Sequence, residues 1–191
     1  MNISCVMIIK NGQKTVKKVL DSLSEFDDVV LYDTNSTDDT KKIALSYKNV
    51  NFIDGEFIGF GPTKNVAASY AKHKWIFSID SDEVVSSELL KTLKNIKLDP
   101  DVVYGIYRTN FYKEYKIKYS GWGGQVIPRV YHIEKTKYND KLLHENIITD
   151  NFKEKTLSGE LEHYSYHSVS DFIAKVELYS SVYADEKAGK K

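Results

Sequence analysis

Cysteine is almost absent from this sequence, and arginine is rare. Cys5 is the only cysteine among 191 residues, so no disulfide can form within the chain. Its apolar neighbours are typical of a buried, unreactive thiol. Arg108 and Arg129 are the only arginines, and every other basic residue is a lysine. Because arginine can bind phosphate or carboxylate through two parallel hydrogen bonds, each of the two is a candidate ligand for such a group, with a surface ion pair as the alternative.

The sequence also lacks excess charge, a long apolar run and a targeting segment. Basic and acidic residues number 27 each, and the resulting net charge of zero gives no general attraction to nucleic acid. No apolar stretch approaches the ~20 residues of a membrane-spanning helix. The N-terminus has no basic region, and its apolar stretch is too short for a signal peptide. We therefore expect a cytoplasmic protein.

Strand-like apolar runs alternate with helix-like segments over the first hundred residues. The runs cover residues 3–9, 27–33, 49–54 and 74–80. We expect Ser36, and Ser86 or Ser87, to cap two of the intervening helices, and residues 59–62 (GFGP) to form a turn before another. Such alternation with short connections predicts an α/β fold, in which a parallel sheet is covered by helices on both faces.

The pattern changes after Pro100, where Tyr, Ile and Val alternate with polar residues and turns. This change favours antiparallel or mixed strands added to the same sheet. A final helix would carry an apolar face made of Phe172, Ile173, Val176, Tyr179 and Tyr183. Since the sequence shows neither repeats nor a linker, we expect one domain over residues 1–191, with a first half at 1–100 and a second at 101–191.

Three carboxylates stand at the end of the run WIFSID: Asp80, Asp82 and Glu83. Acids this close repel one another, so solvent, hydrogen bonds or a cation must offset the repulsion. At an extended strand end, residues i and i+2 point the same way. Asp80 and Asp82 could therefore hold one Mg²⁺ or Mn²⁺ together with substrate phosphates. The alternative is a capped turn that leads into the next helix.

Other candidate site residues stand at strand ends and helix starts. Asp33 ends the second run, where it could accept hydrogen bonds from ribose or a base, with an Asx-turn or a cap as the alternative. Lys64 and Asn65 follow two glycines at a helix start, where backbone N–H groups could hold an anion. Glu145, beside His144 in a mostly apolar segment, could be a general base, and a half-buried ion pair is the alternative.

Two further features are weaker. His163 and His167 lie four residues apart, but their polar neighbours favour strand or loop over helix, so we predict no zinc site. Trp122, in the loop GWGG, could stack on a sugar or simply pack the loop.

Seven blocks in a fixed order carry a family resemblance over essentially the whole chain. They are SCVMIIKNGQKTVKKVLDSL, LYDTNSTDDT, GFGPTKN, WIFSIDSDEVVS, GW…PRVY, LLHENI and HYSYHSVSDFIAKVELYSSVYADEKAGK. The sequence resembles glycosyltransferase family 2, most closely the bacterial branch that adds sugars to the lipopolysaccharide or lipooligosaccharide core. The resemblance implies a GT-A fold, whose Rossmann-like central sheet is mostly parallel. It also implies an inverting hexosyltransferase that uses a nucleoside-diphosphate sugar such as UDP-glucose.

The resemblance also implies which residues would bind the donor. Asp33 would bind the uridine end. Lys64 and Asn65 would lie near the nucleotide or diphosphate, and Arg129 near the diphosphate or the donor sugar. Asp80 would contribute to donor binding through the metal.

The same resemblance implies a divalent metal and a catalytic base. Asp80 and Asp82 would hold Mn²⁺ or Mg²⁺, with Asp82 as the direct ligand. Glu145 would be the base that takes a proton from the acceptor hydroxyl, and His144 would stand beside it.

The acceptor would be a saccharide or glycolipid of a surface glycan such as lipooligosaccharide or capsule. Peripheral contact with the inner membrane would use a lysine-rich surface and the last helix, but the zero net charge gives it little support. One alternative function is a sugar-phosphate nucleotidyltransferase, which the single glycine of IIKNGQKT disfavours. The other is a non-catalytic carbohydrate- or partner-binding module, which would not need acids at two strand ends.

Overall fold

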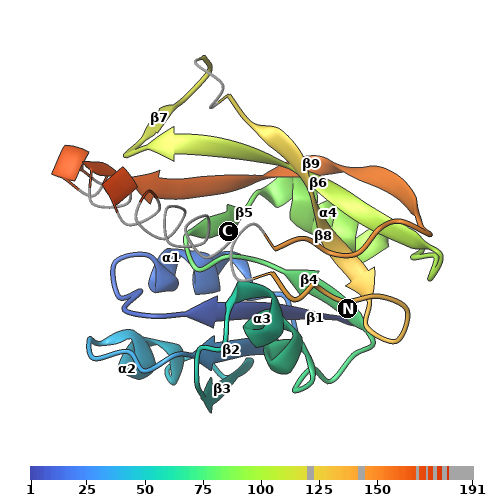
Figure 1. The fold of residues 1–191 in the computed structure, drawn as a ribbon, viewed down its shortest axis with the longest axis horizontal. Coiled ribbons are helices and arrows are strands. Elements are labelled where there is room, and N and C mark those ends of the chain that lie inside the picture. Colours follow the sequence, from blue (N-terminus) through green and yellow to red (C-terminus); the bar gives the residue numbers. More distant parts are fainter. Residues whose placement is uncertain are drawn as a thin grey trace, which may run out of the picture.

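The computed structural model describes residues 1–119, 123–141, 145–166, 168–170, 172–173, 176–177 and 180. Within these residues the strands form one nine-stranded sheet, in the order β3-β2-β1-β4-β8-β6-β9-β5, with β7 paired to β6 (Figure 1). Strands from both halves of the sequence therefore belong to the same sheet. The helices cover it on both faces, as expected for the predicted α/β architecture.

The first half of the sheet is parallel. It consists of β1 (Ile3–Ile9), β2 (Val29–Asp33), β3 (Val50–Asp54) and β4 (Trp75–Ser78). β1 pairs with β2 on one side and β4 on the other, and β3 extends the sheet beyond β2. These strands confirm the four apolar runs, although β2 begins two residues later than predicted, β3 and β4 begin one residue later, and β4 ends two residues earlier.

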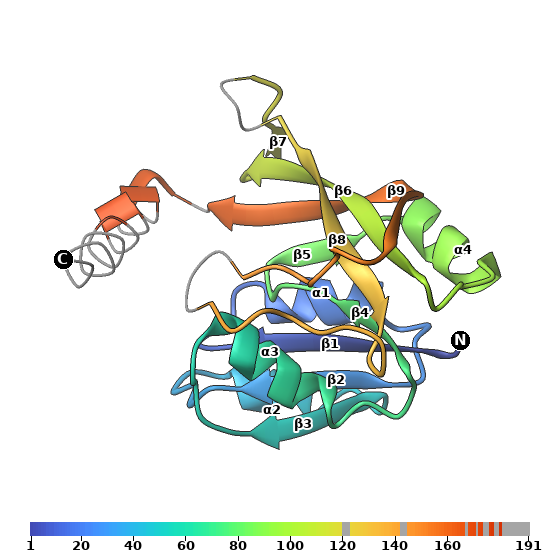
Figure 2. The same cartoon turned by 45° about the vertical axis from the view of Figure 1, so that its right-hand side comes forward.

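The second half of the sheet is mixed, which confirms the predicted change of pattern. Its strands are β5 (Glu83–Val85), β6 (Val102–Tyr112), β7 (Tyr115–Lys116), β8 (Gln125–His132) and β9 (Lys153–Tyr166). β8 runs antiparallel to both β4 and β6, whereas β6 and β9 are parallel. Figure 2 shows β6 and β9 above the parallel strands β1 to β4, with β8 between the two groups.

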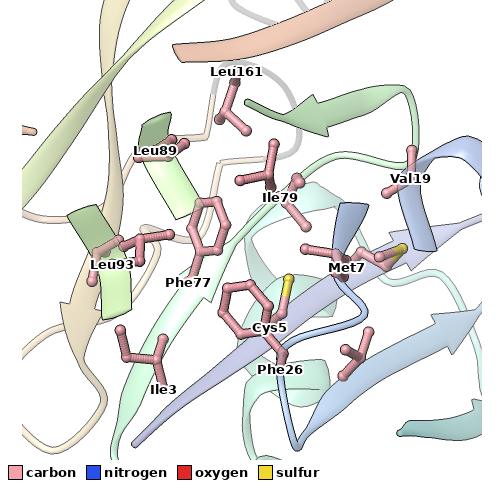
Figure 3. Close-up of a cluster of buried hydrophobic side chains, with 14 of the residues drawn as sticks. Ile3, Cys5, Met7, Val19, Phe26, Phe77, Ile79, Leu89, Leu93 and Leu161 are labelled. Carbon is pink, nitrogen blue, oxygen red and sulfur yellow. The ribbon is translucent and has the colours of Figure 1, made fainter. Parts of the chain in front are cut away.

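Two apolar cores lie on opposite faces of the sheet because successive residues of β1 point to opposite sides. Cys5 and Met7 belong to the larger core, together with apolar residues of α1 (Val16–Ser22), α2 (Thr40–Ala44) and α4 (Ser87–Asn95) (Figure 3). Val6 belongs to the smaller core, which is closed by α3 (Phe60–Ala68). Cys5 is fully buried, and burial raises the pKa of its thiol well above the ordinary value, as expected for an unreactive core cysteine.

The helix starts agree with the sequence only in part. Ser86 is the predicted cap of α4, and its hydroxyl accepts the N–H of Leu89 at 3.2 Å. The prediction for Ser36 is wrong, because α2 begins only at Thr40. Ser36 instead donates its hydroxyl to the carboxylate of Asp33, so this side chain is used to shape the loop between β2 and α2.

The prediction of a turn at residues 59–62 is also wrong. Gly59 is the N-cap of α3, with a φ of 104°, and residues 60–62 form the first helical turn. Pro62 is compatible with this turn because the N–H groups there have no partner inside the helix. A Cβ on Gly61 would come 2.0 Å from the carbonyl oxygen of Asn139, so a glycine here lets the chain pass close to α3.

The chain after β9 is helical at residues 169–170, 172–173, 176–177 and 180. Among the predicted face residues, Phe172, Ile173 and Val176 are exposed on this helix. Tyr179 and Tyr183 lie outside the described residues. Within the described part of the chain, no helix has the length and hydropathy needed to cross a membrane.

Gly159→Ala is expected to destabilise the fold. Gly159 has a φ of +92°, and a Cβ there would come 2.2 Å from the backbone nitrogen of Leu89, where β9 passes α4. Overpacking at a strained position costs about 2 kcal/mol or more, which lowers the Tm of a chain this size by several degrees. Thermal unfolding checks this, with the exposed neighbour Ser158→Ala as control. Equal Tm values for the two variants would contradict the packing argument.

Candidate functional site

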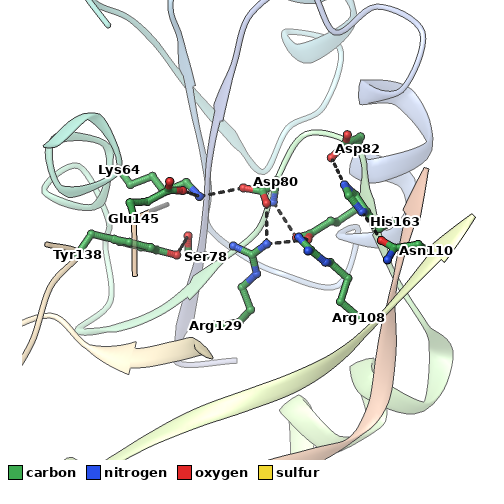
Figure 4. A network of polar contacts seen from close by, with 11 residues as sticks. Lys64, Ser78, Asp80, Asp82, Arg108, Asn110, Arg129, Tyr138, Glu145 and His163 are labelled. Atoms are coloured by element: carbon green, nitrogen blue, oxygen red, sulfur yellow. Dashed lines mark hydrogen bonds and ion pairs between the residues drawn. The ribbon is translucent and has the colours of Figure 1, made fainter. Parts of the chain in front are cut away.

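Charged side chains from distant parts of the sequence meet beyond the carboxyl end of β4 (Figure 4). They form a chain of alternating charges, in the order Glu145, Lys64, Asp80, Arg129, Glu83 and Arg108. Lys64 comes from α3, Arg129 from β8 and Arg108 from β6, while Asp80 follows β4 and Glu83 begins β5. Three acids and three bases therefore balance one another in this site.

Lys64 joins two of the predicted site carboxylates. Its Nζ lies 2.9 Å from Asp80 Oδ1 and 2.7 Å from Glu145 Oε1, and only 6% of the side chain is exposed. Burial acts to lower the pKa of this ammonium, but the neighbouring negative charges, above all Asp80, raise the pKa beyond its ordinary value. Lys64 is thus a fixed cation that holds Glu145 next to Asp80.

Arg129 joins Asp80 to Glu83. Its Nη2 lies 2.6 Å from Asp80 Oδ2 and 2.6 Å from Glu83 Oε1, and the side chain is buried. Burial would raise the pKa of the Asp80 carboxyl, but the charges of Arg129 and Lys64 hold that pKa well below its usual range. Arg129 Nε is buried without a hydrogen-bond partner among the described residues.

Asp80 and Asp82 do not extend from a strand end, so that sequence-based expectation is wrong. The Asp80 carbonyl accepts the N–H of Glu83 at 3.0 Å, and the Asp80 N–H donates to Glu83 Oε2 at 3.0 Å. These bonds close a turn, and the two aspartates consequently have different neighbours. Asp80 contacts Lys64 and Arg129, whereas Asp82 Oδ1 lies 3.4 Å from His163 Nε2.

His163 is a site residue that the sequence did not reveal. It lies on β9, which confirms the strand interpretation of its segment, and its Nδ1 is 2.7 Å from Asn110 Oδ1 on β6. Pairing of β9 with β5 brings His163 next to the turn that carries Asp82. This approach depends on long-range strand pairing, for which the local sequence contains no signal.

The chemistry of Asp80 and Asp82 fits a divalent metal. Both carboxylates are partly exposed, at 31% and 22%, and carboxylate oxygen is the ligand type that Mg²⁺ and Mn²⁺ prefer. Within the described residues, no three His, Cys, Asp or Glu side chains are arranged as a ready metal site. Oxygen atoms of a substrate phosphate would therefore have to complete the coordination shell.

Asn65 holds the segment that precedes Glu145. Its amide oxygen accepts the N–H of Tyr138 at 2.9 Å, and its amide nitrogen donates to the Tyr138 carbonyl at 2.9 Å. Tyr138 in turn donates its hydroxyl to Ser78 Oγ at 2.9 Å, and Lys64 Nζ lies 5.1 Å from the centre of its ring. The sequence did not single out Tyr138, although it contacts both β4 and α3 beside Lys64.

Asp33 lies at the end of β2, as predicted, but is already hydrogen-bonded. It is 2% exposed, and its carboxylate accepts both the N–H of Ser36, at 3.0 Å, and the Ser36 hydroxyl. These are local turn contacts, and Asp33 does not cap a helix, because α2 begins only at Thr40. Trp122, His144 and His167 lie outside the described residues, so of the predicted catalytic pair only Glu145 is placed.

Arg129→Met is expected to destabilise the protein strongly. The substitution leaves Asp80 and the fully buried Glu83 without their closest cation. Breaking a buried ion pair from one side costs about 3–5 kcal/mol. Arg108→Met is the matched control, because Arg108 is more exposed and its single contact with Glu83 is 3.5 Å long. Chemical denaturation measures both, and a smaller loss for Arg129→Met than for Arg108→Met would contradict this account.

Comparisons with known proteins agree on one family. A family model described as "Glycosyl transferase family 2" matches residues 4–163. An uncharacterized glycosyltransferase of Rickettsia prowazekii is 27% identical over 99% of this chain and 70% of its own length. The lipopolysaccharide core biosynthesis glycosyltransferase LpsC of Rhizobium meliloti is 24% identical over 97% of this chain and 71% of its own.

A solved structure shares the fold. TarS of S. aureus (residues 1–349), in complex with UDP, superposes with a TM-score of 0.58 and 19% identity, covering 90% of this chain and 62% of its own. The same fragment has also been solved with UDP-GlcNAc. The chain thus spans about 70% of these sequence relatives and less than two thirds of this structural one.

Proposed function

The chain belongs to glycosyl transferase family 2, and on that premise we propose that it transfers a hexose from a UDP-hexose, such as UDP-glucose, to a hydroxyl of a saccharide acceptor. Transfer would invert the anomeric carbon in a single displacement. The acceptor would be a saccharide or glycolipid, and the pathway the synthesis of lipooligosaccharide, capsule or another surface glycan on the cytoplasmic side of the inner membrane. The likeness to LpsC supports this choice of pathway.

One observation carries the proposal: Lys64 contacts both Asp80 and Glu145, at 2.9 and 2.7 Å. Sugar transfer needs a base at the attacking hydroxyl and, next to it, a group that holds the departing diphosphate. Glu145 has the chemistry of the base, and Asp80 belongs to the pair of carboxylates that would bind the donor through a metal. The buried ammonium of Lys64 therefore holds the Glu145 and Asp80 carboxylates close together.

The proposed reaction assigns each charged group a task. Glu145 accepts the proton of the acceptor hydroxyl as that oxygen attacks, and Lys64 holds the Glu145 carboxylate in place. Arg129 fixes Asp80, and with Lys64 it adds positive charge to the place where the diphosphate becomes more negative. A divalent metal held by Asp80 and Asp82 would neutralise further charge on the leaving nucleoside diphosphate.

The nucleotide end of the donor would lie near Asp33. The UDP complex of TarS supports a uridine nucleotide as the first candidate. Because Asp33 is buried and bonded to Ser36, nucleotide binding would require the loop at Ser36 to yield one of these bonds. Asn65 would act indirectly, through its two bonds to the backbone of Tyr138.

Product analysis tests this function against both alternatives. We expect free UDP to be released slowly from UDP-glucose in the presence of Mn²⁺, with water in place of the acceptor, and no pyrophosphate to form from UTP and glucose 1-phosphate. Pyrophosphate formation would instead identify a sugar-phosphate nucleotidyltransferase. Absence of both turnover and UDP binding would identify a non-catalytic binding module.

A further inference from the structure

A pocket of about 280 Å³ has Asp82 in its lining. Figure 4 shows Asp82 on the opposite side of Asp80 from Lys64 and Glu145. Its walls come from α1 and the residues before it, from β5, from the turn between β6 and β7, and from β9. The charged and aromatic lining residues are Lys14, Lys18, Asp82, Lys113, Glu114 and Tyr164. Its volume is just below the roughly 300–1,000 Å³ of ligand pockets, which suits a ligand about the size of one sugar residue.

Three ammonium groups of this pocket have no carboxylate partner among the residues that the structure describes. Lys14, Lys18 and Lys113 are exposed, and within the described part of the chain none forms an ion pair. By contrast, Lys17 on the same helix as Lys18 pairs with Asp21 at 2.8 Å and does not line the pocket. Three unpaired cations around one concave surface favour an anionic ligand.

Tyr164 gives the pocket a fixed aromatic wall. Its ring stacks on Phe111, with centroids 5.0 Å apart, and its hydroxyl donates to Glu162 at 2.7 Å. Lys18 Nζ lies 3.5 Å from the ring centroid, so the cation and the ring form one surface. The Tyr164 N–H also donates to the Asp82 carbonyl at 2.8 Å, which attaches this wall to the turn of the reaction site.

The lining also contains two carboxylates, Asp82 and Glu114. Carboxylates repel a dense anion such as a diphosphate where no metal lies between them, and they accept hydrogen bonds from hydroxyl groups. A ligand that matches both kinds of lining residue therefore carries a negative group, which pairs with the lysines. It also carries hydroxyl groups, which donate hydrogen bonds to the carboxylates. An apolar ring face can pack against Tyr164. A sugar residue with a phosphate or carboxylate substituent has all three features.

We propose that this pocket is an acceptor subsite that binds an anionic sugar residue, phosphorylated or carboxylated, next to the reaction centre. The proposal rests on the proposed function and specifies its acceptor. The donor is the less suitable occupant, because its uridine would lie at Asp33 and its diphosphate at Asp80. In that arrangement the anionic residue of the acceptor occupies the pocket while a hydroxyl of the same acceptor reaches Glu145.

The test uses simple sugars as probes for the wild type and two variants. Ligand-observed NMR measures the binding of glucose 6-phosphate, glucuronic acid and glucose in the millimolar range. We expect at least one of the two anionic sugars to bind the wild type more tightly than glucose does. We expect Lys18→Gln/Lys113→Gln to weaken that binding about tenfold or more, as for the loss of a charged hydrogen bond. The control Lys17→Gln should leave it unchanged.

The same variants are titrated with UDP and Mn²⁺, which separates this inference from the proposed function. If the pocket binds the acceptor, the wild type, Lys18→Gln/Lys113→Gln and Lys17→Gln should bind UDP with the same affinity. A loss of UDP affinity in Lys18→Gln/Lys113→Gln would assign the pocket to the donor and overturn the inference. The inference would also be overturned if glucose bound as tightly as the anionic sugars, or if neither anionic sugar bound. Failure of UDP to bind the wild type would instead overturn the proposed function.

Discussion

Glu145→Gln is expected to lower UDP release from UDP-glucose by about 10²–10⁴-fold, the usual contribution of a general base. The amide keeps the shape of the side chain and can still accept a hydrogen bond from Lys64, but it cannot take up a proton. Binding of UDP should therefore remain at the wild-type level. A turnover assay measures the loss of UDP release, and thermal unfolding with UDP on the same preparation measures whether UDP binding is unchanged.

Glu134→Gln is the matched control for this experiment. Glu134 is an exposed glutamate that pairs with Lys74 on the surface, so its substitution should leave both turnover and UDP binding unchanged. Wild-type turnover in Glu145→Gln would show that another group is the base. Loss of UDP binding in that variant would show that Glu145 holds the donor and not the acceptor.

Asp82→Asn is expected to weaken Mn²⁺-dependent UDP binding by at least about a hundredfold. Loss of groups that only support metal ligands already costs about 10–100-fold in affinity, and Asp82 would be a direct ligand. The backbone carbonyl of Asp82, which accepts the N–H of Tyr164, is unchanged, so the turn should keep its shape. Calorimetric titration with UDP in the presence of Mn²⁺ measures the effect.

Ser81→Ala, in the same turn, is the control for Asp82→Asn, because it removes no charge. Its UDP affinity should match that of the wild type. If Asp82→Asn binds UDP as tightly as Ser81→Ala does, Asp82 is not a metal ligand. In that case its contact with His163 would be a structural ion pair between β9 and the turn after β4.

The sequence predicts the parallel half of the sheet well, because its apolar runs are short, continuous and bounded by polar residues. β1 follows its run over the whole range Ile3–Ile9. The start of α2 is less predictable, since STDDT offers a capping side chain at every position and Ser36 is used by Asp33 instead. The helical start at Phe60 also escapes prediction, because Gly-Phe-Gly-Pro is as typical of a turn as of a first helical turn.

The chain of alternating charges is less accessible to sequence reasoning. Asp80 and Glu145 can be singled out by their positions, but nothing local shows that Lys64 contacts both. The same holds for Tyr138 and His163, which reach the site through contacts with Asn65 on α3 and through the pairing of β9 with β5. The apolar run before Asp80 suggests a strand end there. The chain turns instead, because residues 80 and 83 form a hydrogen bond that apolar periodicity does not reveal.

The central claim, that this chain binds a uridine nucleotide through a divalent metal, is tested most directly by thermal unfolding of the wild type. UDP is added with Mn²⁺ in one sample and with EDTA in the other. A ligand at about 100 times its Kd adds roughly 2.7 kcal/mol to the free energy of unfolding, which raises the Tm of a chain this size by several degrees. The account predicts this increase with Mn²⁺ and none with EDTA. No increase with Mn²⁺, or an equal increase in both samples, would contradict it.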